Sequence, residues 1–189
     1  MDALLGDIFS SPSTRDNIRS LAASVLFRAP IVREWCLLTG GIDARKSVAH
    51  AALARGRSLI VRPGGLAEQL RTTWGREIVY LKSRKGFLKL AMQHNSVPVV
   101  PFFAIREWIQ KKCGVALPLA VGYWGSQCPL PVATTVVFGA PLKLDCKNAE
   151  APTQAEIDAA HKKFCDSLRA LFDSHKGDLG YGDRELEIV

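Results

Sequence analysis

Two glycines followed by an acidic residue form the first group whose residue types and spacing suit chemistry. Gly64 and Gly65 stand between a short apolar run, residues 58–61, and a segment with helical spacing, residues 66–70. At such a strand-to-helix turn, the unpaired N–H groups and the helix dipole favour an anion, such as a phosphate or a developing oxyanion. Glu68, in the first helical turn, would counter the dipole or orient a donor. A plain structural turn is the alternative, because glycine pairs are common after strands.

A second group places two cations at the expected start of a helix. Ser83 has the character of an N-cap for a helix that reaches Ala91. Arg84 and Lys85 then lie at its amino end, where the helix dipole disfavours positive charge. Cations in that place suggest an acidic partner, and solvated surface side chains are the alternative. The face expected to be apolar consists of Phe87, Leu90, Ala91 and His94.

Histidine is the usual general base of enzymes, and His94 is the candidate for that role here. It ends the apolar face of the second helix, just before an expected strand at residues 97–105. A histidine at a helix C-terminus is also a common cap and dipole partner, so the two interpretations stay open. We expect His50 to be a core or surface residue, and His161 and His175 to be solvated.

These motifs belong to an ordered series that covers the chain from about residue 21 to its end. The series comprises residues 33–41, 63–68, 84–91, 134–141 and 152–158. In this order it resembles the type 2 diacylglycerol acyltransferase family, which includes monoacylglycerol and wax-alcohol acyltransferases. The likeness corresponds to the C-terminal part of a typical member. We therefore expect residues 21–189 to be the C-terminal portion of an acyltransferase-like domain, preceded by a poorly defined segment at residues 1–20.

The resemblance implies an α/β fold, with strands and flanking helices of the glycerolipid acyltransferase type and the N-terminal part missing. It implies an O-acyltransferase of triacylglycerol synthesis that moves an acyl group from acyl-CoA to diacylglycerol at the cytosolic face of the endoplasmic reticulum membrane. Acyl-CoA and glycerolipid are then substrates, and no metal or organic cofactor is expected. The candidate substrate-binding residues are Gly64, Gly65, Glu68, Arg84 and Lys85.

Three departures from the family pattern bear on activity. The His-Pro-His-Gly motif that supplies the presumed catalytic histidine has no match in the 189 residues, and neither does the N-terminal membrane hairpin. A Gly-Glu-Asn segment expected after residues 102–105 is also missing. The chain is accordingly predicted to be a fragment, an incomplete gene model or a shortened paralogue that is inactive alone. A non-catalytic lipid- or acyl-CoA-binding module derived from the family is the alternative, and the acceptor and acyl-chain preference stay open.

Composition and charge limit the classes of molecule that this chain is expected to bind. Hydrophobic residues make up 48% and charged residues 23% of the 189, which fits a folded globular chain. The net charge of +7 favours anions, without choosing between an anionic membrane and a CoA-like ligand. No nucleic-acid motif occurs, so nucleic acid is the least expected partner. Five scattered cysteines without a C-x-x-C pair indicate reduced thiols and no metal site, and no secretory signal peptide is recognisable.

The elements that must position these residues follow from local signals. Helices are predicted at 30–38, closed by two glycines, at 43–54, and after Pro152, where Thr153 and Glu156 form a capping box. The last helix carries an apolar stripe at positions 157, 164, 168, 171 and 172 and ends by Gly177. For residues 21–27, the pattern is too short to decide between a strand and a buried helical turn. Residues 113–142 are uncharged but rich in proline and glycine, which argues against a transmembrane helix. We expect this stretch to end in a strand at residues 133–138. The rest of it either belongs to the buried core or lines an acyl groove or contacts the membrane, and Tyr123 and Trp124 are the candidates for such a contact.

Overall fold

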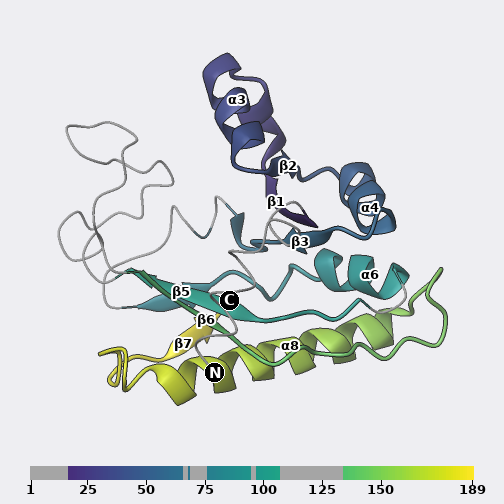
Figure 1. Cartoon of the computed structure of the whole chain (residues 1–189). Coiled ribbons are helices and arrows are strands. Elements are labelled where there is room, and N and C mark those ends of the chain that lie inside the picture. The colour runs from purple at the N-terminus through teal and green to yellow at the C-terminus, as the bar shows by residue number, and fades with distance from the viewer. Residues whose placement is uncertain (1–16, 66–67, 69–75, 95–96, 107–133) are drawn as a thin grey trace. The chain divides into compact units, whose positions relative to one another are not determined.

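The computed structural model describes residues 17–65, 68, 76–94, 97–106 and 134–189. The chain divides into two compact units, Met1–Arg62 and Pro63–Val189 (Figure 1). Most of the predicted N-terminal segment 1–20 lies outside the described residues, so the predicted domain boundary stays a prediction. The coarse class is mixed α/β, as expected, and its sheets are small.

The first unit is built on a three-stranded parallel sheet of order β2-β1-β3. Its strands are β1 (Ile18–Ala22), β2 (Gly41–Asp43) and β3 (Ser58–Ile60). A short 3-10 helix, η1 (Ser24–Phe27), and α3 (Pro30–Leu38) connect β1 to β2. The helix α4 (Lys46–Ala54) connects β2 to β3. Residues 21–27, left open by the sequence, are thus divided between the end of β1 and η1.

Local signals explain the borders of the two helices in this unit. Proline stands at the start of α3, and Gly40, at φ +75°, lets the chain leave the helix in the left-handed conformation that glycine tolerates. The predicted range 30–38 is confirmed. The prediction that α4 begins at Asp43 is wrong, because Asp43 belongs to β2. Its carboxylate accepts from Ser24 Oγ at 2.7 Å and from Arg45 Nε at 2.9 Å, and α4 starts only after Arg45.

The second unit contains two small sheets and two helices. The strands β4 (Glu77–Val79) and β7 (Leu186–Ile188) pair in parallel, and β5 (Phe102–Arg106) and β6 (Thr134–Phe138) pair antiparallel. The long helix α8 (Gln154–His175) packs against β5, β7 and the shorter helix α6 (Gly86–Gln93). The main hydrophobic core lies between these elements and includes Leu81, Leu88, Met92, Leu144, Phe164, Leu168 and Ile188.

The capping box predicted for α8 is confirmed. Glu156 N–H donates to Thr153 Oγ1, and Thr153 N–H donates to the Glu156 carboxylate at 2.9 Å. Of the predicted stripe, four residues are buried and Leu171 is half-buried; Ala160 and Cys165 complete the buried face. Phe164 meets Phe87 of α6 edge to face, with ring centroids 5.1 Å apart.

Two predictions of local structure need correction. The helix α6 begins at Gly86 with Lys85 at its N-cap, so Ser83 lies outside it and does not cap it. Its buried face is Leu88, Ala91 and Met92, with Leu90 and His94 half-buried. The strand expected from residue 97 starts only at Phe102. Prolines at 98 and 101 lack the N–H that a strand ladder needs. Between them, Val99 forms an isolated antiparallel bridge with Leu142.

Most of the uncharged stretch 113–142 lies outside the described residues, including Tyr123 and Trp124. Its last part forms β6, which confirms the predicted strand to within one residue. In the part of the chain that the structure describes, no helix is long and apolar enough to cross a membrane.

Candidate functional site

The turn at Gly64 and Gly65 leads into a helical turn, as the sequence predicts. Glu68 N–H donates to the Gly64 carbonyl at 3.4 Å, the spacing of an α-helical hydrogen bond. The two glycines are needed for different reasons. Gly65 has φ +55°, which disfavours any residue with a Cβ. At Gly64 a Cβ would lie 2.7 Å from the Cβ of Glu68 and 2.5 Å from its Cδ, far inside van der Waals contact.

The carboxylate of Glu68 folds back over Gly64 and binds the main chain of the next strand. Its Oε2 accepts from Tyr80 N–H at 3.0 Å, directly after β4. Burial raises the pKa of Glu68, and the hydrogen bond from Tyr80 opposes that rise. Glu68 therefore positions the end of β4.

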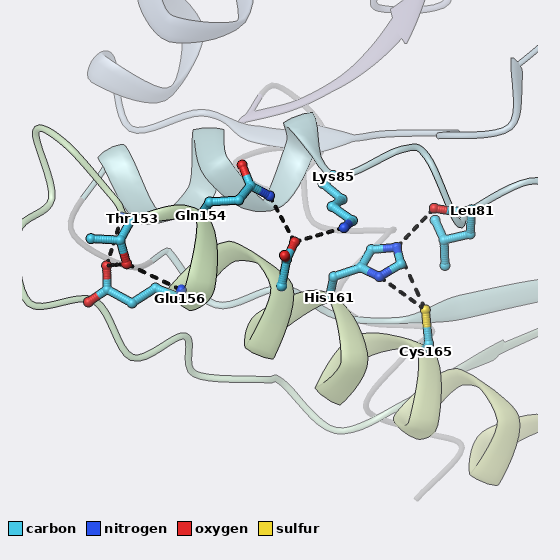
Figure 2. A network of polar contacts seen from close by, with 8 residues as sticks. Leu81, Lys85, Thr153, Gln154, Glu156, His161 and Cys165 are labelled. Carbon is cyan, nitrogen blue, oxygen red and sulfur yellow. Dashed lines mark hydrogen bonds and ion pairs between the residues drawn. The ribbon is translucent and has the colours of Figure 1, made fainter.

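An acidic partner was expected for the two cations at the start of α6. For Lys85, this partner is a residue of the same chain, Asp158. Lys85 Nζ is 2.7 Å from Asp158 Oδ1 on α8, and Gln154 Nε2 donates to the same oxygen at 2.8 Å (Figure 2). The hydrogen bond from Lys85, followed by that from Gln154, lowers the pKa of Asp158. Arg84 is exposed and has no ion pair among the described residues.

The expectation that His161 and His175 are solvated is wrong. His161 Nε2 lies 2.9 Å from the Leu81 carbonyl oxygen (Figure 2). Because a carbonyl only accepts, Nε2 carries the hydrogen. Cys165 Sγ lies 3.8 Å from both ring nitrogens of His161, and burial raises the pKa of the Cys165 thiol. His175 Nδ1 lies 3.0 Å from the Leu171 carbonyl oxygen, at the end of α8.

Three segments that are distant in sequence thus meet on the connection between β4 and α6. Glu68 binds the N–H of Tyr80, His161 binds the carbonyl of Leu81, and Asp158 binds the side chain of Lys85. The Val189 carbonyl adds bonds from the N–H groups of residues 81 and 82, at 2.8 and 2.9 Å. Sequence analysis found Glu68 and Lys85 but not their partners. The signal was present, since residues 154, 158, 161 and 165 share one face of α8.

His94 lies at the other end of α6. It is the C-cap, its N–H donates to the Ala91 carbonyl at 3.3 Å, and its side chain is half-buried. At 1.5 Å per residue, the helix separates His94 from Lys85 by about 13 Å along its axis. The structure therefore does not bring the candidate base to the cations at the start of the same helix.

Among the cavities formed by described residues, one in each unit has the size of a ligand pocket. The first, of about 440 Å³, is lined by Arg19, Arg55, Arg57 and residues of β2 and α4. Arg19 and Arg57 already have interactions: the Arg19 guanidinium donates to the Ile18 carbonyl, and Arg57 has a partner. The second, of about 530 Å³, lies between residues 143–147 and the first turns of α8. Neither is lined by Gly64, Gly65 or Glu68, so the anion site expected there stays a prediction.

The described part of the chain contains no cluster of three or more His, Cys, Asp or Glu side chains suited to a metal ion. The three cysteines within it, Cys36, Cys146 and Cys165, are free thiols.

Comparison with known proteins decides the family. The sequence model of the family described as diacylglycerol acyltransferase matches residues 5–107 and 103–189. The chain belongs to this family. The resemblance predicted from the ordered motifs is thereby confirmed. The two matched segments of the diacylglycerol acyltransferase pattern meet at residues 103–107, where the sequence lacks the expected Gly-Glu-Asn segment.

Curated relatives agree with this assignment. Diacylglycerol O-acyltransferase 2 of Xenopus tropicalis is 33% identical over 210 residues, which cover 94% of this chain and 56% of the relative. The human protein of the same name is 31% identical over 206 residues, covering 93% of this chain and 51% of the relative. Diacylglycerol O-acyltransferase 1 of Eremothecium gossypii is 30% identical, over 86% of this chain and 41% of the relative.

The chain spans about half the length of the curated relatives it matches. The alignment of 210 residues is longer than the 189 residues of the chain, so the relative carries residues within the matched region that this chain lacks. No solved structure matches, and the specific fold name inferred from the family stays a prediction.

Proposed function

We propose that this chain serves acyl transfer from acyl-CoA to the free hydroxyl of diacylglycerol, giving triacylglycerol at the cytosolic face of the endoplasmic reticulum membrane. The observation that carries the proposal is the match of the diacylglycerol acyltransferase family along almost the whole chain. Curated relatives named diacylglycerol O-acyltransferase support the same reaction.

The reaction needs donors for the oxyanion that develops on the thioester, and the N–H groups of Gly64 and Gly65 are the candidates. Glu68 supports them by fixing the turn to the end of β4. Arg84 is the better candidate for the acyl-CoA phosphates, because it is exposed whereas Asp158 already neutralises Lys85. We propose no metal or organic cofactor, and acyl-CoA is a substrate.

The reaction also needs a base for the acceptor hydroxyl, which typically contributes about a hundred- to ten-thousand-fold to the rate. The 189 residues contain no His-Pro-His-Gly, and His94 lies at the far end of α6 from Arg84. We therefore propose that the 189-residue chain alone does not catalyse acyl transfer. The same observation favours the second candidate function, a non-catalytic lipid- or acyl-CoA-binding module.

The test compares three proteins in microsomes that lack endogenous activity, with labelled oleoyl-CoA and diacylglycerol. They are the 189-residue chain, its His94→Ala variant, and a chimera that places before this chain the part of the human relative preceding the matched region. We expect triacylglycerol from the chimera only. Turnover by the chain alone that is lost in His94→Ala would make His94 the base and refute the prediction of inactivity.

A pair of variants in the chimera examines the substrate contact. Arg84→Gln should raise the KM for oleoyl-CoA, whereas Lys89→Gln, an exposed cation further along α6, should leave it unchanged. A chimera that binds acyl-CoA but forms no ester would favour the binding module. Monoacylglycerol and a long-chain alcohol, offered in competition with diacylglycerol, identify the acceptor.

A further inference from the structure

Exposed apolar side chains are concentrated on one short part of the first unit. Eight large hydrophobic residues of the described chain are exposed, and six of them belong to η1 and α3. The six are Val25, Leu26, Ile31, Trp35, Leu37 and Leu38; the other two, Val100 and Val136, lie in the second unit. No residue of η1 or α3 is buried. Such a concentration marks an interaction surface rather than scattered surface residues.

Three of these side chains form a continuous stripe along α3. Ile31, Trp35 and Leu38 are spaced i, i+4 and i+7, so they share one face of the helix. Their exposed fractions are 84%, 54% and 85%. Only Val32 and Cys36 of this helix are partly covered, and α3 contacts η1 and β2. In Figure 1, α3 is the dark purple helix that extends away from the sheet of its own unit.

The stripe is held on a well-defined helix. The helix starts at Pro30, and the Thr39 hydroxyl donates to the carbonyls of Trp35 and Cys36 at 3.0 and 3.1 Å at its other end. A Cβ at Gly41 would lie 2.8 Å from the Cys36 carbonyl oxygen, so the chain turns tightly back into β2. An exposed apolar stripe on a fixed helix is ready to bind without further folding.

The charge of this unit indicates which kind of partner covers the apolar surface of η1 and α3. Residues 17–62 contain eight Lys and Arg side chains and two carboxylates. Both carboxylates already have ion pairs, Glu34 with Arg33 at 3.0 Å and Asp43 with Arg45 at 2.9 Å. The whole unit 1–62 is also positive, with nine cations and five carboxylates. Two copies of such a surface would repel each other, whereas a negatively charged apolar medium attracts it.

We propose that η1 and α3 form a docking element for the surface of a bilayer that contains anionic lipid. The Ile31, Trp35 and Leu38 stripe enters the boundary between head groups and acyl chains, with Val25 beside it. Arg28, exposed between η1 and α3, contacts the anionic head groups. Tryptophan suits this boundary because its ring is amphipathic. The element would lie on the membrane without crossing it, which deepens the membrane location proposed above.

The test uses the 189-residue chain and vesicles of phosphatidylcholine alone or mixed with phosphatidylserine, separated from free protein by flotation. We expect stronger binding to the mixed vesicles, weakened by salt. Ile31→Ser and Leu38→Ser should each weaken binding about tenfold, because each removes one large apolar side chain from the boundary. Val136→Ser is the matched control, since it removes an exposed apolar side chain from the second unit. Circular dichroism should be unchanged in all three variants.

A second measurement follows Trp35 directly. Brominated lipids should quench the fluorescence of the chain, and the quenched part should disappear in Trp35→Phe. Three outcomes would overturn the proposal: equal binding by the Ile31→Ser, Leu38→Ser and Val136→Ser variants, a dimer in buffer that Leu38→Ser dissociates, or Trp35 emission already typical of a buried ring without vesicles. Acyl transfer is scored separately in the chimera, so the docking element and the proposed reaction can fail independently.

Discussion

Gly64→Ala should detach Glu68 from Tyr80. Carbon atoms that are not bonded approach to about 3.5–4.0 Å, whereas the new Cβ would meet the Cβ of Glu68 at 2.7 Å and its Cδ at 2.5 Å. Because the Cβ of Glu68 is attached to the backbone, a rotation of the carboxylate alone does not relieve the overlap. The turn has to open, and the hydrogen bond to Tyr80 N–H is lost.

The expected magnitude has two parts. Losing a hydrogen bond to a charged acceptor costs about 1.5 kcal/mol, the low end of the usual range, since Glu68 is only half-buried. Overpacking adds about 1.5 kcal/mol, so the free energy of unfolding should decrease by about 3 kcal/mol. Gly65→Ala acts differently. A Cβ there meets nothing within 4 Å, and its cost is the left-handed conformation at φ +55°, about 1–2 kcal/mol.

Urea unfolding and amide hydrogen exchange at Tyr80 separate the two effects. Gly64→Ala should accelerate exchange of the Tyr80 amide, and Gly65→Ala should leave it near the wild-type rate. In a Glu68→Ala background, the cost of Gly64→Ala should decrease by about 1.5 kcal/mol, because that hydrogen bond is already gone. The cost of Gly65→Ala should not change. Additive costs for Gly64 and Glu68, with unchanged exchange at Tyr80, would refute the packing argument.

Two further predictions concern stability in the second unit. Thr153→Ala removes the capping box of α8 and should lower the free energy of unfolding by about 1 kcal/mol in urea, whereas Thr153→Ser should retain most of it; equal values would contradict the cap. Burial raises the pKa of Glu68 above its ordinary value of 4.5, so the folded state binds this proton more tightly. Its contribution to stability therefore declines as the pH rises from 4.5 through the raised pKa. Glu68→Gln should remove that decline from urea midpoints measured across this range, and an unchanged pH profile would exclude the effect.

The sequence predicted the elements that local chemistry determines. The range of α3 followed from a proline at one end and glycines at the other, and the start of α8 followed from its capping box. The strand β6 followed from a β-branched run. In each case the residues that fix the element lie within it or next to it, so no knowledge of distant neighbours was needed.

The contacts between residues that are distant in sequence could not be predicted in the same way. Glu68 meets Tyr80, Lys85 meets Asp158, and His161 meets Leu81, pairs that packing brings together from separate elements. Local chemistry favoured an N-cap at Ser83, but α6 begins three residues later, where Leu88, Ala91 and Met92 reach the core. Tertiary burial outweighed the cap, because a buried leucine contributes about 1.5–3 kcal/mol and a cap typically about 1.

The contacts around α6 also change how the two cations at its start, Arg84 and Lys85, contribute to the proposed reaction. Lys85 turns to Asp158, so its charge is largely cancelled for any incoming anion. Gly86 has open space where a side chain would be, and the first turn of α6 contains no acidic residue. Attraction of an acyl-CoA phosphate to this end of the helix then depends on Arg84 and on the N–H groups of the first turn. The two adjacent cations are therefore not equivalent: Lys85 fixes α6 to α8, and Arg84 is the one whose loss should affect acyl-CoA binding with little effect on folding.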